Sequence, residues 1–123
     1  MTLEYFPRAD SEGIVKKNIS DIDARWSETV YVPRSMLAGT TEFRNGVFNG
    51  SKSRYDEIML VLEGEADVSD RDTGQTFHIL KGDCFLAKIG SRVTLRVKDY
   101  LKFWYVAHPP CNELMVGASY VET

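Results

Sequence analysis

The sequence has 123 residues, which suits one domain with its own core and leaves no room for two. Hydrophobic residues make up 43% and charged residues 27%, and the formal net charge is −3. Because nucleic acids and anionic membranes both favour basic surfaces, this balance argues against either as a partner. The first residues show neither a basic start nor a long apolar stretch, and no apolar run approaches the ~20 residues of a membrane helix. We therefore expect a cytoplasmic protein.

The N-terminal part of the chain is polar. Residues 1–27 contain Pro7, Gly13 and several charges, which predicts an extended arm with a short strand near Gly13. Residues 21–26 are compatible with a single helical turn, too short to be stable alone. We expect residues 1–34, the arm and first strands, to pack on a barrel core formed by residues 35–123.

From residue 28 onward the sequence is a series of short strands separated by turns. β-Branched and aromatic residues, often alternating with polar ones, predict strands at residues 29–32, 36–47, 57–63, 65–69, 76–80, 84–87, 92–98 and 102–107. Turn-forming residues stand between them at 70–74, 81–83 and Gly90. Short strands at this regular spacing, with no competing helical periodicity, predict an all-β barrel or sandwich.

Two of these strands are apolar on both faces. Ile58, Leu60 and Leu62 alternate with Met59 and Val61, and residues 103–106 show the same pattern. A strand with one wet face alternates between apolar and polar residues, so both strands should be covered on both sides. Because no helix is predicted to provide the second cover, we expect another subunit there, and hence a homodimer.

The two cysteines do not form a disulfide framework. Cys84 opens the apolar run of residues 84–87, where a small buried hydrophobic side chain is expected. Cys111 follows two prolines near the C-terminus and is interpreted as a free surface thiol.

Two spaced motifs carry a resemblance to a known superfamily. Glu57, six residues and Gly64 match the end of the first cupin motif, and Gly82, seven residues and Gly90 match the frame of the second. In order and in frame, the chain also resembles the Q-type ethanolamine-utilisation cupins at residues 55–58, 61–65, 74–76, 82–83, 90–91 and 102–109. The resemblance covers residues 35–110 and implies a small double-stranded β-helix (RmlC-like jelly-roll) barrel, without the extra N-terminal region of longer family members.

The same alignment implies that the usual cupin metal site has been lost. A cupin metal normally has three imidazole ligands and one carboxylate. Here the first two histidine positions fall on Ser51 and Ser53, or on Gly50 and Lys52 with the longer spacing, and the third falls on Val93. Because only Glu57 remains, we expect no bound metal and no other cofactor.

Three further polar residues, His78, His108 and Lys88, are not expected to bind a metal. His78 and His108 lie outside the metal motif, and we expect structural or surface roles for both. Lys88 replaces the proline that the resembled family carries in its second motif, and either solvent or the barrel mouth could receive its amine.

Strand alternation predicts the lining of the barrel. If Glu57 points inward, Met59 and Val61 do too, and if Val93 takes the histidine position, Leu95 and Val97 follow it. The result is an apolar pocket with one acid near its opening, whose pKa should be raised unless it is paired. Other candidate wall residues are Arg44, Tyr55, Trp104 and Tyr105.

Three functional classes follow. The resemblance favours a metal-free accessory cupin that binds a small polar metabolite. An enzyme is the second class, either an isomerase, an aminohydrolase or an acetate-kinase-like protein with Glu57 as acid/base. The sequence has no Gly-rich phosphate loop and no evident carboxylate pair for Mg²⁺, which argues against phosphoryl transfer. The third class is a structural scaffold with a filled barrel.

Overall fold

The computed structural model describes residues 3–5, 14–19 and 21–110. The described residues form strands and turns without any helix. The strands are β1 (Ile14–Ile19), β2 (Asp21–Val32), β3 (Met36–Asn49), β4 (Asp56–Asp70), β5 (Thr76–Leu80), β6 (Cys84–Ala87) and β7 (Val93–His108). Every strand pair is antiparallel, so the all-β prediction is confirmed. Nothing in these ranges has the helical length and apolarity that crossing a membrane would require.

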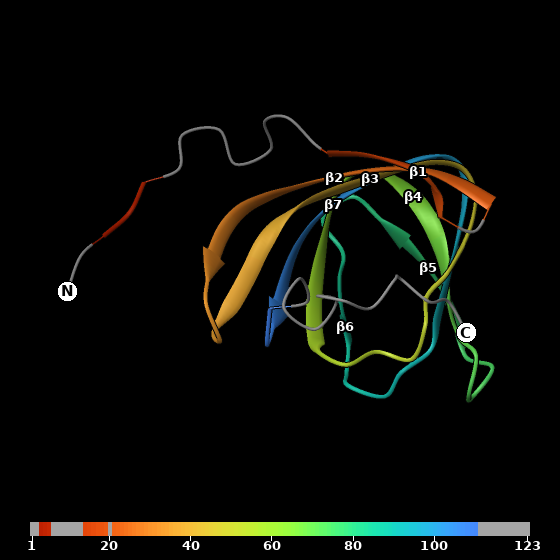
Figure 1. The fold of residues 1–123 in the computed structure, drawn as a ribbon. Coiled ribbons are helices and arrows are strands. Elements are labelled where there is room, and N and C mark those ends of the chain that lie inside the picture. The colour runs from red at the N-terminus through yellow and green to blue at the C-terminus, as the bar shows by residue number, and fades with distance from the viewer. Residues whose placement is uncertain (1–2, 6–13, 20, 111–123) are drawn as a thin grey trace.

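The strands follow the order β1-β2-β3-β7-β4-β5, and β6 pairs with β4 beside this path. Figure 1 shows β2, β3, β7 and β4 as one strongly curved sheet, with β5 and β6 below it. The strand β4 connects the two regions because its first residues pair with β6 and its last residues pair with β5, while β7 runs beside both parts. This curvature encloses the core.

Three sequence-based boundaries differ from the structure. The helical turn expected at residues 21–26 is wrong, because this segment opens β2 and pairs with β3 from Asp21 onward. Residues 57–63 and 65–69 belong to the single strand β4, and residues 92–98 and 102–107 belong to β7. The irregularities at residues 61–67 of β4 bend the strand without ending it. Local turn residues alone could not distinguish a bend from an end.

The core lies on the inner face of the curved sheet. Its side chains come from β2 through β7 and alternate with outward-facing residues, as strand geometry requires. The buried cluster comprises Ala24, Leu37, Phe43, Met59, Val61, Ala66, Val68, Ile79, Ala87, Leu95, Val97, Leu101, Phe103 and Tyr105. The Phe43 ring packs against Phe103 of the same cluster and against the partly buried Phe48, at centroid distances of 5.8 and 5.1 Å.

The hairpin between β4 and β5 forms as the sequence predicts. The Asp70 carboxylate accepts hydrogen bonds from the backbone N–H groups of Asp72 (2.8 Å) and Thr73 (3.3 Å), which lower its pKa. Gly74 closes the turn with φ +79°. From the same turn, the Arg71 guanidinium donates to the Val93 carbonyl (3.0 Å) and the Gly50 carbonyl (2.5 Å). Arg71 therefore fastens the hairpin to the start of β7 and to the segment after β3.

The prediction for Cys84 is wrong. Its side chain is exposed, because the next residue, Phe85, packs on the core and places Cys84 on the opposite face of β6. In this chain Phe85 and Ala87 face the core, and Cys84 and Leu86 face outward. Cys111 lies outside the described residues.

Candidate functional site

Glu57 lies on the inner face of β4, near the end of the sheet where the loops of residues 50–55 and 88–92 meet. Met59 and Val61, the next residues on its face, are buried in the core. Its register partners are Ala107 on β7 and Ala87 on β6, both buried and apolar. The carboxyl therefore faces the barrel interior, and the side chain is half-buried, as expected for a residue at a barrel mouth.

The surroundings of Glu57 leave it without a polar partner. Among the described residues, none forms a hydrogen bond or ion pair with its carboxyl, and burial raises its pKa to about 7. The cause is loss of hydration, which favours the neutral acid. Near neutral pH the group therefore exists in both protonation states and can either donate or accept a hydrogen bond.

The loops beside Glu57 hold the positions that carry histidine in metal-binding cupins. Ser53 is fixed by hydrogen bonds: its N–H donates to the Ser91 carbonyl (3.0 Å), and its carbonyl accepts from the Gly90 N–H (2.7 Å). Its hydroxyl donates to the Tyr55 carbonyl (2.6 Å). These bonds join the two loops beside Glu57, so Ser53 helps to fix their relative position.

The structure brings together only part of the predicted lining. Met59 and Tyr105 are register partners on the inner face and lie in the core, while Val93 packs on the core from the start of β7. Trp104 lies on the outer face, because consecutive residues of a strand face opposite sides. Arg44 is exposed on the outer face beside the buried Phe43. Tyr55 is half-buried in the loop before β4.

Neither histidine shares the inner face with Glu57. His78 is exposed on β5, where its ring nitrogens contact Asp67 (2.8 Å) and Glu65 (3.0 Å), and these acids raise its pKa. His108 is exposed and contacts the Ser35 carbonyl through Nδ1. Lys88 is exposed as well, which agrees with the solvent interpretation.

The residues at the barrel mouth do not fit the usual cupin metal. Val93 stands at the third imidazole position, and either Ser51 and Ser53 or, with the longer spacing, Gly50 and Lys52 stand at the first two. None of these residues offers a good ligand for the metals that imidazole selects. In the ranges that the structure describes, no three His, Cys, Asp or Glu side chains gather as a metal-binding group. The absence of a bound metal remains a prediction.

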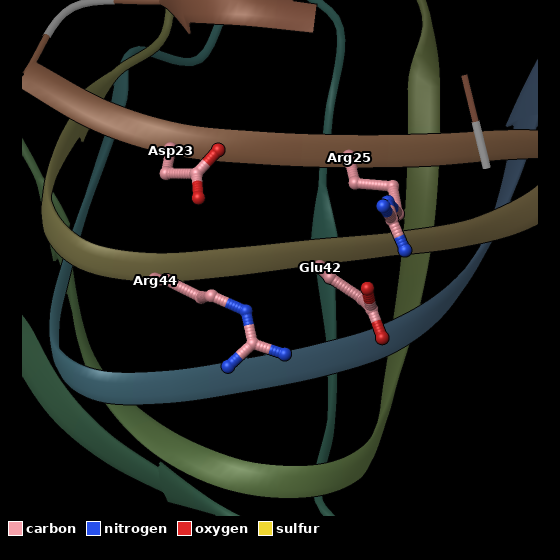
Figure 2. A pocket seen from close by; sticks show the side chains of 4 residues that line it. All are labelled: Asp23, Arg25, Glu42 and Arg44. Atoms are coloured by element: carbon pink, nitrogen blue, oxygen red, sulfur yellow. The ribbon is translucent and has the colours of Figure 1, made fainter. Parts of the chain in front are cut away.

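A second polar site lies on the outer face and was not predicted from the sequence. Asp23 and Arg25 of β2 and Glu42 and Arg44 of β3 line a pocket of about 200 Å³ (Figure 2). The sequence contains its residues in two triplets, 23–25 and 42–44, and in each an acid and an arginine flank one apolar residue. Their meeting could not be predicted, because it depends on the register between β2 and β3.

The described strands form an antiparallel barrel with the Glu57 carboxyl near one end of the sheet, an architecture typical of cupins. The fold agrees with that of the Schizosaccharomyces pombe Cnp3 cupin domain, with a TM-score of 0.62 over 80% of this chain and 74% of that chain, at 15% identity. The chain therefore has the cupin fold. A family model for the ethanolamine utilisation protein EutQ matches residues 27–112, so the chain belongs to the EutQ family.

Two related proteins show how much of this chain is similar to known EutQ proteins. A 75-residue segment, 61% of this chain, is 40% identical to a protein of Escherichia coli K12 named acetate kinase EutQ, and spans 31% of that protein. The crystal structure of a putative ethanolamine utilization protein Q from Salmonella typhimurium LT2 has a TM-score of 0.61 and 31% identity, covering 71% of this chain and 70% of that chain. The chain thus matches about a third of the length of the curated relatives.

Proposed function

We propose that the protein binds a small polar metabolite at the barrel mouth through Glu57 and acts as a metal-free accessory protein in cytoplasmic amine catabolism. The observation that carries this proposal is the Glu57 carboxyl, which faces an apolar interior and has no polar partner among the described residues. An unsatisfied buried acid costs free energy unless a ligand completes its hydrogen bonds. The family description, ethanolamine utilisation, supports an amine or amino alcohol as the ligand class.

The chemistry of the mouth supports the same ligand class. A cationic amine would convert Glu57 to its charged form by pairing with it, and a hydroxyl could donate to it or accept from it. The apolar side chains beside it, including Met59 and the Tyr105 ring, would contact a short hydrocarbon segment. A compact molecule with one amine or hydroxyl and a short carbon chain meets both requirements.

Ethanolamine is the first probe for this proposal. We expect isothermal titration calorimetry to show binding to the wild-type protein, and Glu57→Gln to weaken it at least about tenfold, because one charge-assisted hydrogen bond is lost. Glu63→Gln is the matched control, since Glu63 is an exposed acid on the same strand. Equal affinity in wild type and Glu57→Gln would refute the assigned role of Glu57.

Measurement of turnover distinguishes an enzyme from a protein that only binds its ligand. If Glu57 is an acid/base, product should form from the bound probe, and Glu57→Gln should abolish that turnover while binding is only weakened. The name acetate kinase belongs to relatives of which the matched segment spans about a third, so that activity is not transferred to this chain. If none of a panel of small amines, alcohols and amides binds, the scaffold interpretation replaces the proposal.

We further propose that the protein forms a homodimer through the outer face of β4, β6 and β7. Ile58 is 49% exposed, and its register partners on either side are Leu86, 50% exposed, and Val106. Leu60, 38% exposed, lies beside Trp104 in the next row. We call these five side chains the outer apolar patch. A contiguous apolar surface of this kind is typical of an interface.

A second copy suits this patch better than a strongly charged partner. The adjoining row of the sheet carries charges of both signs, in the order Arg25, Glu42, Lys102 and Glu63. Their sum is zero, so two copies approaching through this face meet no net repulsion there.

Placing a charge in the patch should separate the dimer. We expect Ile58→Lys to raise the dimer dissociation constant by about 100-fold, because burying an unpaired ammonium group costs several kcal/mol. Sedimentation equilibrium would measure this change. Leu80→Lys is the matched control, since Leu80 is 49% exposed on β5, outside the patch. A monomeric wild-type protein at the highest concentrations used would contradict the proposal.

A further inference from the structure

The pocket on the outer face of β2 and β3 is built by strand register. Asp23 is paired with Arg44, and Arg25 with Glu42, across the two strands. The residues between them, Ala24 and Phe43, are buried in the core, so the four charged side chains share the outer face. Figure 2 shows two of them rising from each strand around the same hollow. Acid and base alternate around it, which places two positive and two negative groups in one small pocket.

Tyr100 of β7 holds the two β3 side chains in place. Its hydroxyl donates a hydrogen bond to Oε1 of Glu42 (2.7 Å), and the Arg44 guanidinium lies 4.5 Å from the centre of its ring. Burial and the neighbouring Glu42 raise the pKa of Tyr100, so its hydroxyl remains a donor. Glu42 and Arg44 are therefore positioned before any ligand arrives, which reduces the entropy lost on binding.

The two β2 side chains are not neutralised by their neighbours. No hydrogen bond or ion pair joins Asp23 or Arg25 to any other described residue, although opposite charges line the same pocket. Arg44 also makes no ion pair within that part of the chain, and it contacts Tyr100 only through the ring face. The pocket thus presents a carboxylate and two guanidinium groups whose hydrogen-bonding capacity is unused.

We propose that this pocket binds a small zwitterion, a molecule with one ammonium group and one carboxylate or phosphate group. The ammonium would pair with Asp23 and Glu42, and the anionic group would accept hydrogen bonds from Arg25 and Arg44, whose planar donors match carboxylate and phosphate geometry. A ligand with a single charge would leave the opposite pair unsatisfied. The volume of about 200 Å³ limits the ligand to a few carbon atoms. This site is separate from Glu57, because it lies on the opposite face of the sheet.

The test is a titration of the 123-residue chain, monitored by ¹H–¹⁵N NMR spectra. The probes are β-alanine and 2-aminoethyl phosphate, with propylamine and propionate as analogues that carry one charge. We expect both zwitterions, or the one with the better-fitting anion, to bind in the millimolar range or tighter. The amide shifts should map to residues 23–25, 42–44 and 100. The analogues should bind at least about tenfold more weakly.

Variants establish which groups recognise the ligand. Asp23→Asn and Arg25→Gln change exposed side chains, so the NMR spectra should show a retained fold. Each should weaken zwitterion binding at least about tenfold. Arg96→Gln changes an exposed arginine outside the pocket and should bind as the wild type does. Glu57→Gln should bind equally well, which separates this site from the barrel mouth.

Three results would overturn the proposal. The first is the absence of amide shifts at residues 23–25 and 42–44 with either zwitterion at about 50 mM. That concentration is roughly tenfold above a dissociation constant in the millimolar range. The second is equal binding of the analogues with one charge. The third is shifts confined to the barrel mouth and lost in Glu57→Gln, which would assign the zwitterion to the other site.

Discussion

Glu57→Gln is expected to raise the free energy of unfolding by about 2 to 3 kcal/mol at pH 8 and to change it little at pH 4. In the folded protein the pKa of Glu57 is raised to about 7, against an ordinary value of 4.5. The folded state therefore holds the proton more tightly than the unfolded state. The stability associated with the protonated acid is complete below pH 4.5 and is lost as the pH rises through 7.

The size of this effect follows from the difference between the two pKa values. Each pKa unit corresponds to about 1.4 kcal/mol, so the full difference corresponds to somewhat more than 3 kcal/mol. Glu57 is only half-buried, and water that reaches its carboxyl weakens the effect, so we expect the lower part of the range. The glutamine side chain has the same shape and cannot ionise, which removes the pH dependence at this position.

Urea unfolding of both proteins at several pH values measures the effect, through the difference between their free energies of unfolding. Glu63→Gln is the control, because its acid is exposed on the same strand. A difference between wild type and Glu57→Gln that does not vary from pH 4 to pH 8 would show that Glu57 is not perturbed. A bound amine would also reduce the difference at pH 8, so the comparison is made in its absence and then repeated with ethanolamine.

Gly64→Ala is expected to prevent folding or to cost more than about 4 kcal/mol of stability. Gly64 has φ +82°, and a Cβ atom added there would lie 2.0 Å from the Tyr100 carbonyl oxygen and 2.8 Å from its carbonyl carbon. Both atoms belong to the backbone of β7, which pairs with β3 on its other side. Neither strand can move away without breaking the hydrogen bonds of the sheet. Soluble yield, circular dichroism and urea unfolding would measure the loss.

Gly82→Ala is the matched control for this substitution. Gly82 also has a positive φ (+92°), but an added Cβ would meet nothing within 4 Å. Its cost should be limited to the backbone conformation, about 1 to 2 kcal/mol. Similar losses in the two variants would show that conformational strain, and not the contact with β7, makes Gly64 necessary.

The inner face of the barrel was largely predictable from the sequence. Met59, Val61, Leu95 and Val97 alternate with other residues at the period of a strand, and all four are buried. The hairpin at residues 70–74 was predictable for the same local reason, since it needs one acid to cap the turn and one glycine with positive φ. Both features depend on residues that are close together in the chain, so the local sequence is enough to predict them.

The tertiary structure decided the features that depend on long-range pairing. Trp104 and Tyr105 could not both line the barrel, and only packing shows that Tyr105 faces inward. Arg44 was expected at the barrel and instead stacks over Tyr100 on the outer face. The charged pocket exists because the register between β2 and β3 places Asp23 opposite Arg44. Alternation establishes which residues share a face, but which face is inside, and what lies opposite, follows from contacts between strands far apart in the chain.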